Sequence, residues 1–508
     1  MRGRFWSWIL VVLLGAGPTV ARAAALTRQY FGVGQGPLPE RLLRYVVHRL
    51  PNGIVSVEAP PESLTVLAGL PLTSWIDSVR VFRPLAMEAS PGVFQHLPVS
   101  GLASATARAC SLSVFGLPQV DWGVKAICGD TSLTRTSGGD GVKVGVLDTG
   151  VYPHPDVVRR LRYCIDETTN PPDSSCWDGR TPGGHGTGVA SIIAADGGED
   201  GLGKFGIAPD ALLYSAKVCV GDYCSEDDMA AGIYKLVDQG VNIINISLGG
   251  PSFGSVLKDA LDYAVARNVL IVAAAGNYFG SGPNYDTILY PAAYWRVVSV
   301  GAILEDYSTW ISSARGVNDG DYIREEREVE FGAPGYSLIA SASDGCYIYF
   351  GATSGASPHV AGLAARIWDG DALSTRTRLQ NSARLHDLDV PGDDPATGFG
   401  LPVLMHTADV TESEPGEEPE RLGGRPNPFR ESVSLPFAIT TRQWARVRVL
   451  DVTGRLVREL MQGPLEPGAH MVRWDGFDRR GAACASGLYF VQVQLGERVV
   501  TTRVARVR

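Results

Sequence analysis

The sequence predicts an α/β protein in which helices cover both faces of a parallel sheet, followed by a C-terminal β-sandwich. Between about residues 101 and 410, short apolar runs alternate with helical patterns, which is typical of a parallel sheet. From Pro426 onward the pattern changes to short alternating strands. The chain has 508 residues, of which 45% are hydrophobic, so it can bury more than one core.

The sheet strands are predicted at residues 142–147, 212–218, 241–246 and 269–274, and the helices at residues 185–195, 227–239, 255–267 and 354–368. The connections between them are short, as in strand-helix-strand units. In such sheets the ligand site lies beyond the carboxyl ends of the strands. We therefore expect chemically active side chains at that edge.

Four polar residues are predicted to lie there. Asp148 follows the first strand, Asn277 follows the last, and His185 and Ser354 begin helices. A serine hydroxyl becomes an effective nucleophile when a histidine takes its proton and a buried carboxylate fixes that histidine. The helix N-terminus at Ser354 and the Asn277 amide can stabilise an oxyanion. These residues predict a Ser-His-Asp triad with an asparagine-assisted oxyanion hole.

The motifs around these residues resemble those of the subtilisin-like (subtilase, peptidase S8) family. VGVLDTG resembles its aspartate motif, GGHGTGVAS its histidine motif, GATSGASPHVAG its serine motif and AAAGN its oxyanion-hole segment. The order Asp, His, Ser is also that of the family. Ser247, Leu248 and Gly249 resemble the segment whose backbone binds substrate. The resemblance implies a serine endopeptidase that forms an acyl-enzyme, acts on proteins or peptides and needs no cofactor for its chemistry.

Three positions depart from the family pattern. Ala352 stands where Gly is usual, Gly355 where Met is usual and Gly188 where a second His is usual. None removes a group that does chemistry, but the first two flank the nucleophile and leave the rate open. The alternatives are an inactive relative, which would lack a triad residue, and a serine-carboxyl peptidase, which would carry Glu in place of His185.

Residues 1–23 have the pattern of a secretory signal peptide. Arg2 and Arg4 precede an apolar run at residues 5–14, and residues 21–23 (Ala-Arg-Ala) form a small-x-small cleavage site. The alternative, an N-terminal membrane anchor, is disfavoured because the run is short. We therefore expect a secreted protein, extracellular or at the cell surface of a bacterium.

Residues 24–100 resemble, weakly, the inhibitory prodomain (I9 type) of subtilases, which implies a small α+β domain. The similarity lies in RYVVHRLPNGIVSVEAPPES and SVRVFRP. Such a prodomain assists folding and then blocks the active site, so the enzyme's own prodomain is an expected partner. The alternative is a plain N-terminal extension. Processing is expected between Leu85 and Val114.

After the predicted peptidase domain (residues 101–410), residues 411–425 are acidic, rich in Pro and Gly, and predict a linker. Residues 426–508 resemble the immunoglobulin-like C-terminal domains of the flagellar-hook-cap (FlgD) and type IX sorting kinds. This implies export sorting or surface attachment, through the export machinery or the cell surface. The alternatives are a stabilising accessory domain and an adhesin.

Charge and histidine placement exclude other classes of site. The formal net charge of −9 argues against nucleic-acid binding, which needs a basic face. No metal ligands are assigned, although the acidic loop at residues 196–200 could hold a structural calcium ion. His154 and His359 are expected to be structural. A base at His185 predicts a neutral to alkaline pH optimum.

Eight cysteines in an exported chain predict disulfides. Their spacing favours the pairs Cys219–Cys224, Cys164–Cys176 and Cys110–Cys128, and leaves Cys346 and Cys484 as thiols. No two cysteines have CxxC spacing, which disfavours zinc.

Three further expectations concern local segments. Asp222, Glu226, Asp227 and Asp228 are expected to form an acidic cluster at a helix N-terminus. Residues 322–330 (YIREEREVE) are expected to be a charged surface insertion. The small glycines beside Leu248 suggest that the substrate pocket has room for a large apolar or aromatic side chain.

Overall fold

The computed structural model describes residues 27–33, 43–60, 64, 73–85, 112, 116–175, 177–178, 184–277, 286–320, 322, 324–390, 392–405 and most of 429–507. The chain divides into two compact units, Met1–Val79 and Arg80–Arg508. The predicted signal peptide and linker lie outside the described residues. None of the helices among the described residues is long and apolar enough to cross a membrane.

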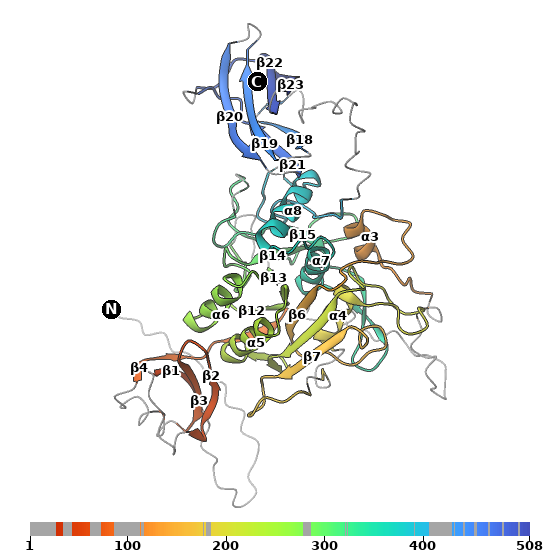
Figure 1. The fold of residues 1–508 in the computed structure, drawn as a ribbon, viewed down its shortest axis with the longest axis vertical. Helices are drawn as coiled ribbons and strands as arrows, with labels where there is room; N and C mark the ends of the chain where they lie inside the picture. Colours follow the sequence, from red (N-terminus) through yellow and green to blue (C-terminus); the bar gives the residue numbers. More distant parts are fainter. Residues whose placement is uncertain are drawn as a thin grey trace, which may run out of the picture. The chain divides into compact units, whose positions relative to one another are not determined.

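A seven-stranded parallel sheet forms the centre of the second unit, which confirms the predicted fold class (Figure 1). Its order is β15-β14-β13-β11-β6-β8-β7, and every adjacent pair is parallel. The strands are β6 (Lys143–Asp148), β7 (Leu161–Asp166), β8 (Leu212–Lys217), β11 (Ile243–Ile246), β13 (Leu270–Ala274), β14 (Val298–Ile303) and β15 (Phe331–Pro334). The strands at the centre of the sheet are buried throughout, as expected for a sheet covered on both faces.

Alternate residues of β6 show how the sheet is covered. Val144 and Val146 belong to the main core, together with α4 (His185–Ala194) and α7 (Thr353–Arg366). Gly145 faces the other way, because a Cβ there would lie 3.0 Å from Leu236 of α5 (Glu226–Asp238). Helix α6 (Ser255–Val265) packs beside α5. Thus α4 and α7 cover one face, and α5 and α6 the other (Figure 1).

Residues 81–84 form a strand, β5 (Val81–Pro84), that was not predicted. It lies between β12 (Leu248–Gly249) and β10 (Tyr223–Ser225) and is antiparallel to both. The hairpin of β9 (Cys219–Val220) and β10 is closed by a Cys219–Cys224 disulfide, which confirms that predicted pair.

Two smaller sheet regions flank this domain in sequence. In the first unit, β1 (Thr27–Val33), β2 (Val46–Arg49), β3 (Ile54–Ala59) and β4 (Thr73–Ser78) form an antiparallel sheet in the order β2-β3-β1-β4. In the C-terminal segment, β18 (Val433–Ile439) pairs with β21 (Gly468–Trp474). A second sheet has the order β20-β19-β22-β23, with β19 (Gln443–Leu450), β20 (Leu456–Leu465), β22 (Gly487–Leu495) and β23 (Arg498–Arg506). Both sheets contribute to one apolar core around the buried Trp474, as in a sandwich.

The remaining helices are short or lie outside the central layers. Helix α3 (Trp122–Cys128) begins at Asp121, whose side chain accepts a hydrogen bond from Val124 N. Helix α8 (Ala372–Leu385) is capped in the same way by Asp371. A hairpin of β16 (Leu338–Ser341) and β17 (Tyr347–Phe350) leads directly into the loop before α7.

Several predictions about cysteines were wrong. Cys128 is a buried thiol in α3, beside Arg366 Nη1 at 3.0 Å, so it does not pair with Cys110. Cys346 was predicted to be a thiol but is disulfide-bonded. Cys164 is disulfide-bonded and Cys484 is a thiol, both as predicted. Spacing failed at Cys128 because the helix places its side chain in the core.

The segment at residues 322–330 is only partly a surface segment, because Glu325 and Glu326 are exposed whereas residues 328–330 are buried. Glu330 is buried, its carboxylate receives two hydrogen bonds from Arg376, and Arg324 is buried beside it. The charges in this segment pair across elements that are distant in sequence, which a local charge pattern does not show.

Candidate active site

Asp148 and His185 are held together at the carboxyl edge of the sheet. Asp148 is the last residue of β6, and His185 is the first residue of α4. His185 Nδ1 lies 2.7 Å from Asp148 Oδ1, which also accepts a hydrogen bond from Thr149 N at 2.7 Å. Because an ionised carboxylate can only accept, Nδ1 carries the proton and Nε2 has a free lone pair. This is the tautomer that a general base needs.

The His185 ring is buried, with one face against Phe350 at a centroid distance of 5.4 Å. Burial lowers the pKa of His185, but the charge of Asp148 and its hydrogen bond outweigh burial and leave the pKa above its ordinary value. Nε2 has no hydrogen-bond partner among the described residues. Nε2 of the buried His359 also lacks a partner within the described part of the chain, so the contact with Asp148 is what distinguishes His185.

Ser354 lies at the start of α7, where the first N–H groups of the helix have no intrahelical acceptor. Its hydroxyl donates to Ser247 O at 3.2 Å, so a rotation about the Cα–Cβ bond would be needed to bond to His185. Ser247 follows β11, and its own hydroxyl bonds to Ser354 O at 3.2 Å. The strand end and the helix start are thereby fixed to each other.

The Asn277 amide is oriented by Thr353. Asn277 Oδ1 accepts hydrogen bonds from Thr353 N (3.1 Å) and Thr353 Oγ1 (2.6 Å), so its NH₂ group points the other way. There, Asn277 Nδ2 donates to Leu85 O at 2.5 Å. Thr353 is a positioning residue that the sequence motifs did not single out.

Residues 81–85 lie as an extended peptide against residues 247–250 and Asn277, and the groove that they fill is called the cleft below. Leu85 N donates to Ser247 O at 3.1 Å, and the pairs Pro84↔Leu248 and Arg83↔Gly249 continue the ladder. The predicted segment Ser247, Leu248 and Gly249 thus binds a strand through its backbone. The chain itself supplies that strand.

Two apolar side chains anchor this peptide. Leu85 is 7% exposed, and a Cβ at Gly249 would lie 2.9 Å from its Cδ1 and 3.0 Å from Leu289 Cδ1. The leucine side chains therefore share one pocket at Gly249, and Leu289 reduces the room that the glycines leave. Phe82 is 0% exposed, and a Cβ at Gly250 would lie 2.9 Å from its ring. Sequence analysis did not single out Leu289, because this aliphatic residue lies outside the motifs that contain catalytic groups.

The structure accounts for two of the three departures from the family pattern. A Cβ at Gly355 would lie 2.6 Å from Leu338 Cδ1, and one at Gly188 would lie 3.0 Å from the Phe350 ring. Leu338 and Phe350 thus fill the space that larger side chains would need. Ala352 is different, because it has φ 62° and ψ −167°, a conformation that is nearly exclusive to glycine.

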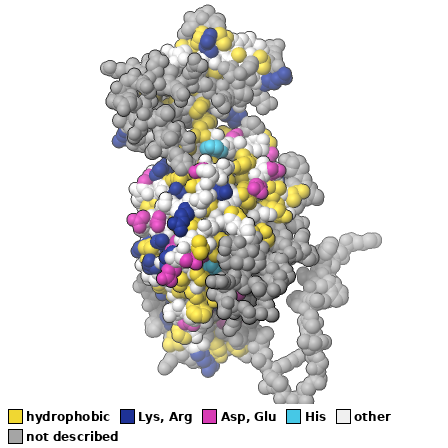
Figure 2. All heavy atoms as spheres, turned by 90° about the vertical axis from the view of Figure 1, so that its right-hand side faces the viewer, with side chains coloured by type: hydrophobic (Ala, Val, Ile, Leu, Met, Phe, Trp, Pro, Cys, Tyr) yellow, Lys and Arg dark blue, Asp and Glu magenta, His cyan; other side chains and the backbone are white. Residues whose placement is uncertain are grey.

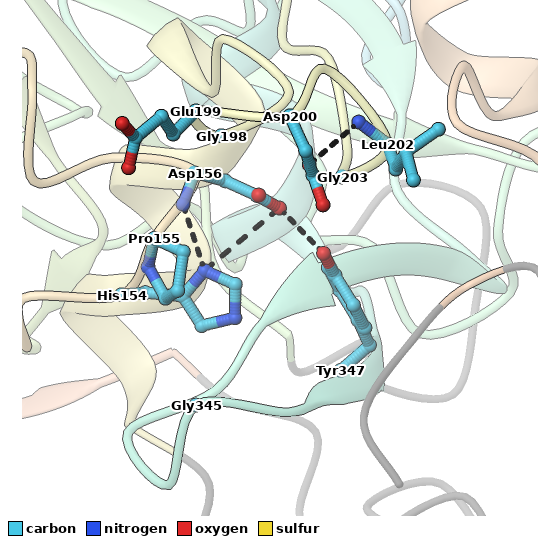
Figure 3. A pocket seen from close by; sticks show the side chains of 10 residues that line it. All are labelled: His154, Pro155, Asp156, Gly198, Glu199, Asp200, Leu202, Gly203, Gly345 and Tyr347. Carbon is cyan, nitrogen blue, oxygen red and sulfur yellow. Dashed lines mark hydrogen bonds and ion pairs between the residues drawn. The ribbon is translucent and has the colours of Figure 1, made fainter. Parts of the chain in front are cut away.

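The acidic loop at residues 196–204 lies beside a pocket of about 410 Å³ (Figure 3). Figure 3 shows Asp156 between the His154 ring and the Tyr347 hydroxyl, which donates to Asp156 Oδ2 at 2.8 Å. His154 is buried and bonds through Nε2 to Cys346 O at 3.1 Å, as expected of a structural histidine. His359 is also buried, and burial lowers its pKa to about 4.

Part of this loop fits a calcium ion poorly. Both Asp196 oxygens are used, since Arg159 and Arg160 each donate to one of them at 2.8 Å. The carbonyls of Gly201 and Gly203 accept hydrogen bonds from Gln119 Nε2 at 2.8 and 2.9 Å. Calcium prefers just such oxygens, but protein donors already bond to these, whereas Glu199 and Asp200 of the same loop line the pocket. The sequence showed the acids but not these donors.

Charged side chains of both signs are interspersed with apolar ones on the face that Figure 2 shows. This arrangement does not form the one-sided basic patch that phosphate binding needs.

Comparisons with known proteins agree with this geometry. A model of the subtilase family matches residues 139–400, and a model of the FlgD Ig-like domain matches residues 434–497. The subtilisin of Bacillus sp. (strain TA39) is 39% identical over 339 residues, which cover 61% of this chain and 79% of that protein. The M-protease of Shouchella clausii (strain KSM-K16) is 29% identical over 384 residues, covering 74% of this chain and 92% of that protein. The solved structure of sphericase superposes with a TM-score of 0.52 at 37% identity, over 56% of this chain and 99% of that one.

Proposed function

The chain belongs to the subtilase family and is a serine endopeptidase, and we propose that Ser354, His185 and Asp148 are its catalytic triad. Ser354 attacks the substrate carbonyl, His185 Nε2 takes the hydroxyl proton and returns it to the leaving amine, and Asp148 holds the imidazole. Asn277 stabilises the oxyanion of the tetrahedral intermediate, and water then releases the acyl-enzyme. The hydrogen bond between His185 and Asp148 and the unpartnered Nε2 support these roles.

We propose further that Leu85–Ala86 is the bond at which the chain processes itself. The observation that carries this proposal is the contact of 2.5 Å from Asn277 Nδ2 to Leu85 O. In a bound substrate, the carbonyl oxygen at this amide belongs to the residue before the scissile bond, called P1. Residues 24–85 would then be the inhibitory prodomain, and β5 the segment that blocks the cleft. This bond lies at the start of the range expected from the sequence.

The cleft contacts also indicate a preference in substrates. Leu85 would be P1 and Phe82, three residues before it, would be P4, and both side chains are buried. Because Leu289 reaches the P1 pocket, an aliphatic side chain should fit better than a large aromatic one. The prediction of a roomy pocket took account of the glycines alone.

The test is expression of residues 24–508 as wild type and as Ser354→Ala, followed by intact mass, N-terminal sequencing and labelling with a fluorophosphonate. The wild type should label and yield a new N-terminus at Ala86, and Ser354→Ala should do neither. Leu85→Asp, as a matched control with an intact triad, should label more slowly because processing at this bond is impaired. A folded wild type that neither labels nor shortens would contradict the proposed triad. Cleavage elsewhere would contradict only the proposed bond.

For the ends of the chain, we propose export through a signal peptide at residues 1–23 and action outside the cell. The C-terminal domain, at residues 426–508, would serve sorting or surface attachment, which its FlgD-like match supports. A secreted adhesin remains the second candidate for this domain. Deleting residues 426–508 should leave peptidase activity unchanged and alter localisation, whereas loss of substrate capture would favour the adhesin.

A further inference from the structure

Glu226 is a buried carboxylate beside the N-terminal end of β5, the strand that fills the cleft. It is the first residue of α5, and its side chain is 0% exposed. Glu226 Oε1 accepts hydrogen bonds from Gly254 N at 2.5 Å and Leu257 N at 3.4 Å. These bonds cap the start of α6, whose N-cap residue, Gly254, has no side chain to do so. They fix the carboxylate and leave Oε2 directed elsewhere.

Arg80 meets that second oxygen. Arg80 Nη1 lies 3.5 Å from Glu226 Oε2, and Arg80 O accepts a hydrogen bond from Glu226 N at 3.0 Å. This backbone bond extends the β5 ladder by one residue beyond the pair Val81↔Ser225. Arg80 therefore continues the extended peptide whose far end is Leu85.

Gly254 makes room for the guanidinium. A Cβ at Gly254 would lie 2.0 Å from Arg80 Nη1, so any larger residue would displace the cation. Burial leaves the pKa of Glu226 above its ordinary value, although the hydrogen bond from Gly254 and the charge of Arg80 act to lower it. A cationic side chain at this position is thus favoured by both shape and charge.

We propose that Glu226 and Gly254 form a subsite that selects a cationic side chain, preferably arginine, at the sixth residue before the scissile bond (P6). This inference rests on the proposed function, because the count of six assumes cleavage between Leu85 and Ala86. Once the cleaved prodomain (residues 24–85) has dissociated, the Glu226 carboxylate would contact the P6 side chain of other substrates. In a purely structural role, Glu226 would cap α6 and be indifferent to P6.

The experiment compares two peptides cleaved by the processed enzyme. One is Arg-Val-Phe-Arg-Pro-Leu-Ala-Met-Glu, the sequence of residues 80–88, and the other carries citrulline, a neutral analogue of arginine, at its first position. We expect kcat/KM for cleavage after leucine to be about fivefold higher for the arginine peptide, as for a half-exposed ion pair. This ratio should fall towards one in 1 M NaCl.

Variants separate the subsite from the cap. Glu226→Gln keeps a hydrogen-bond acceptor for Gly254 N but removes the charge, so the ratio should fall to one. Asp222→Asn removes an exposed negative charge from the turn between β9 and β10. It should leave the ratio of kcat/KM for the two peptides unchanged. A wild-type ratio of one, or a fivefold ratio that persists in Glu226→Gln, would overturn the subsite. If Glu226→Gln does not fold, the wild-type ratio and its loss in salt decide the matter. If neither peptide is cut after leucine, the proposed scissile bond is wrong and the P6 assignment falls with it.

Discussion

The catalytic cleft and the loop at residues 196–204 are both clusters of buried polar groups, but they differ in how those groups are satisfied. In the cleft, His185 Nε2 and Asp148 Oδ2 have no hydrogen-bond partner among the described residues. In the loop, Asp196 and the carbonyls of Gly201 and Gly203 are all paired with protein donors. Unpaired buried groups are costly, and a bound substrate would supply partners in the cleft, whereas the loop has its partners already.

The largest expected effect is a loss of stability when a buried ion pair of the loop at residues 196–204 loses its cation. Lys204 is buried, and its ammonium donates to the buried Asp121 at 2.8 Å. Lys204→Met would leave that carboxylate buried without its cation and should lower the free energy of unfolding by about 3 to 5 kcal/mol. Urea unfolding in a Ser354→Ala background avoids self-digestion. Lys258→Met, which breaks an exposed pair with Asp262, should cost less than about 1 kcal/mol. Equal losses in the two variants would contradict the comparison.

On the cleft side, a substitution should change rate rather than stability. Asn277→Ala should lower kcat by about 100- to 1000-fold, because it removes an oxyanion donor. Steady-state kinetics on a leucine peptide would measure the loss, with thermal unfolding alongside. Asn318 is a suitable control, since its amide is also bonded on both sides, to Val329. Asn318→Ala should lower Tm and leave kcat within about twofold. A small effect of Asn277→Ala on kcat would remove this residue from the oxyanion hole.

Ala352 tests whether strain beside the nucleophile is real. Ala352→Gly removes a side chain from a conformation that only glycine adopts easily, and should raise the free energy of unfolding by about 1 to 3 kcal/mol. Ala356→Gly, near the start of helix α7, should lower it by about 1 kcal/mol or more. Chemical denaturation of both variants gives the sign. Destabilisation by Ala352→Gly would show that the residue is not strained.

The pH profile reports the charge environment of His185. Activity needs the neutral imidazole, and the pKa of His185 is above its ordinary value of 6.5. The profile of kcat/KM should therefore reach half its maximum above pH 6.5 and fall about tenfold per pH unit below that midpoint. Asp222 contributes to the raised pKa, so Asp222→Asn should move the midpoint down. A midpoint well below 6.5 would be inconsistent with the Asp148 contact.

The smallest effect concerns selectivity within the cleft. Leu289→Ala enlarges the P1 pocket and should shift the ratio of kcat/KM for phenylalanine over leucine at P1 upward by about fivefold. Paired peptides that differ only at P1 would measure it. Leu202→Ala, at an exposed leucine, should leave the ratio unchanged. No shift in Leu289→Ala would show that another residue limits the pocket.

The sequence was a good guide wherever function depends on local motifs. Asp148, His185, Ser354 and Asn277 were placed at strand ends and helix starts because each motif contains its own secondary-structure signal. It was a poor guide to contacts between distant segments. The β5 strand depends on pairing with residues near 224 and 248, and the buried Glu330 is paired with Arg376 of helix α8. The sequence placed Glu226 in an acidic cluster at a helix N-terminus, and it does begin α5. The sequence did not show its contact with Arg80.

Because β5 is covalently part of the chain whose cleft it fills, the Leu85 carbonyl reaches the proposed nucleophile without any encounter between molecules. Self-processing at this bond would be a first-order event, with a half-time that does not depend on the enzyme concentration. The extent of dissociation of the cleaved prodomain does depend on concentration, because the prodomain can rebind once it is a separate molecule. Dilution after export would then set when the enzyme becomes available to other substrates.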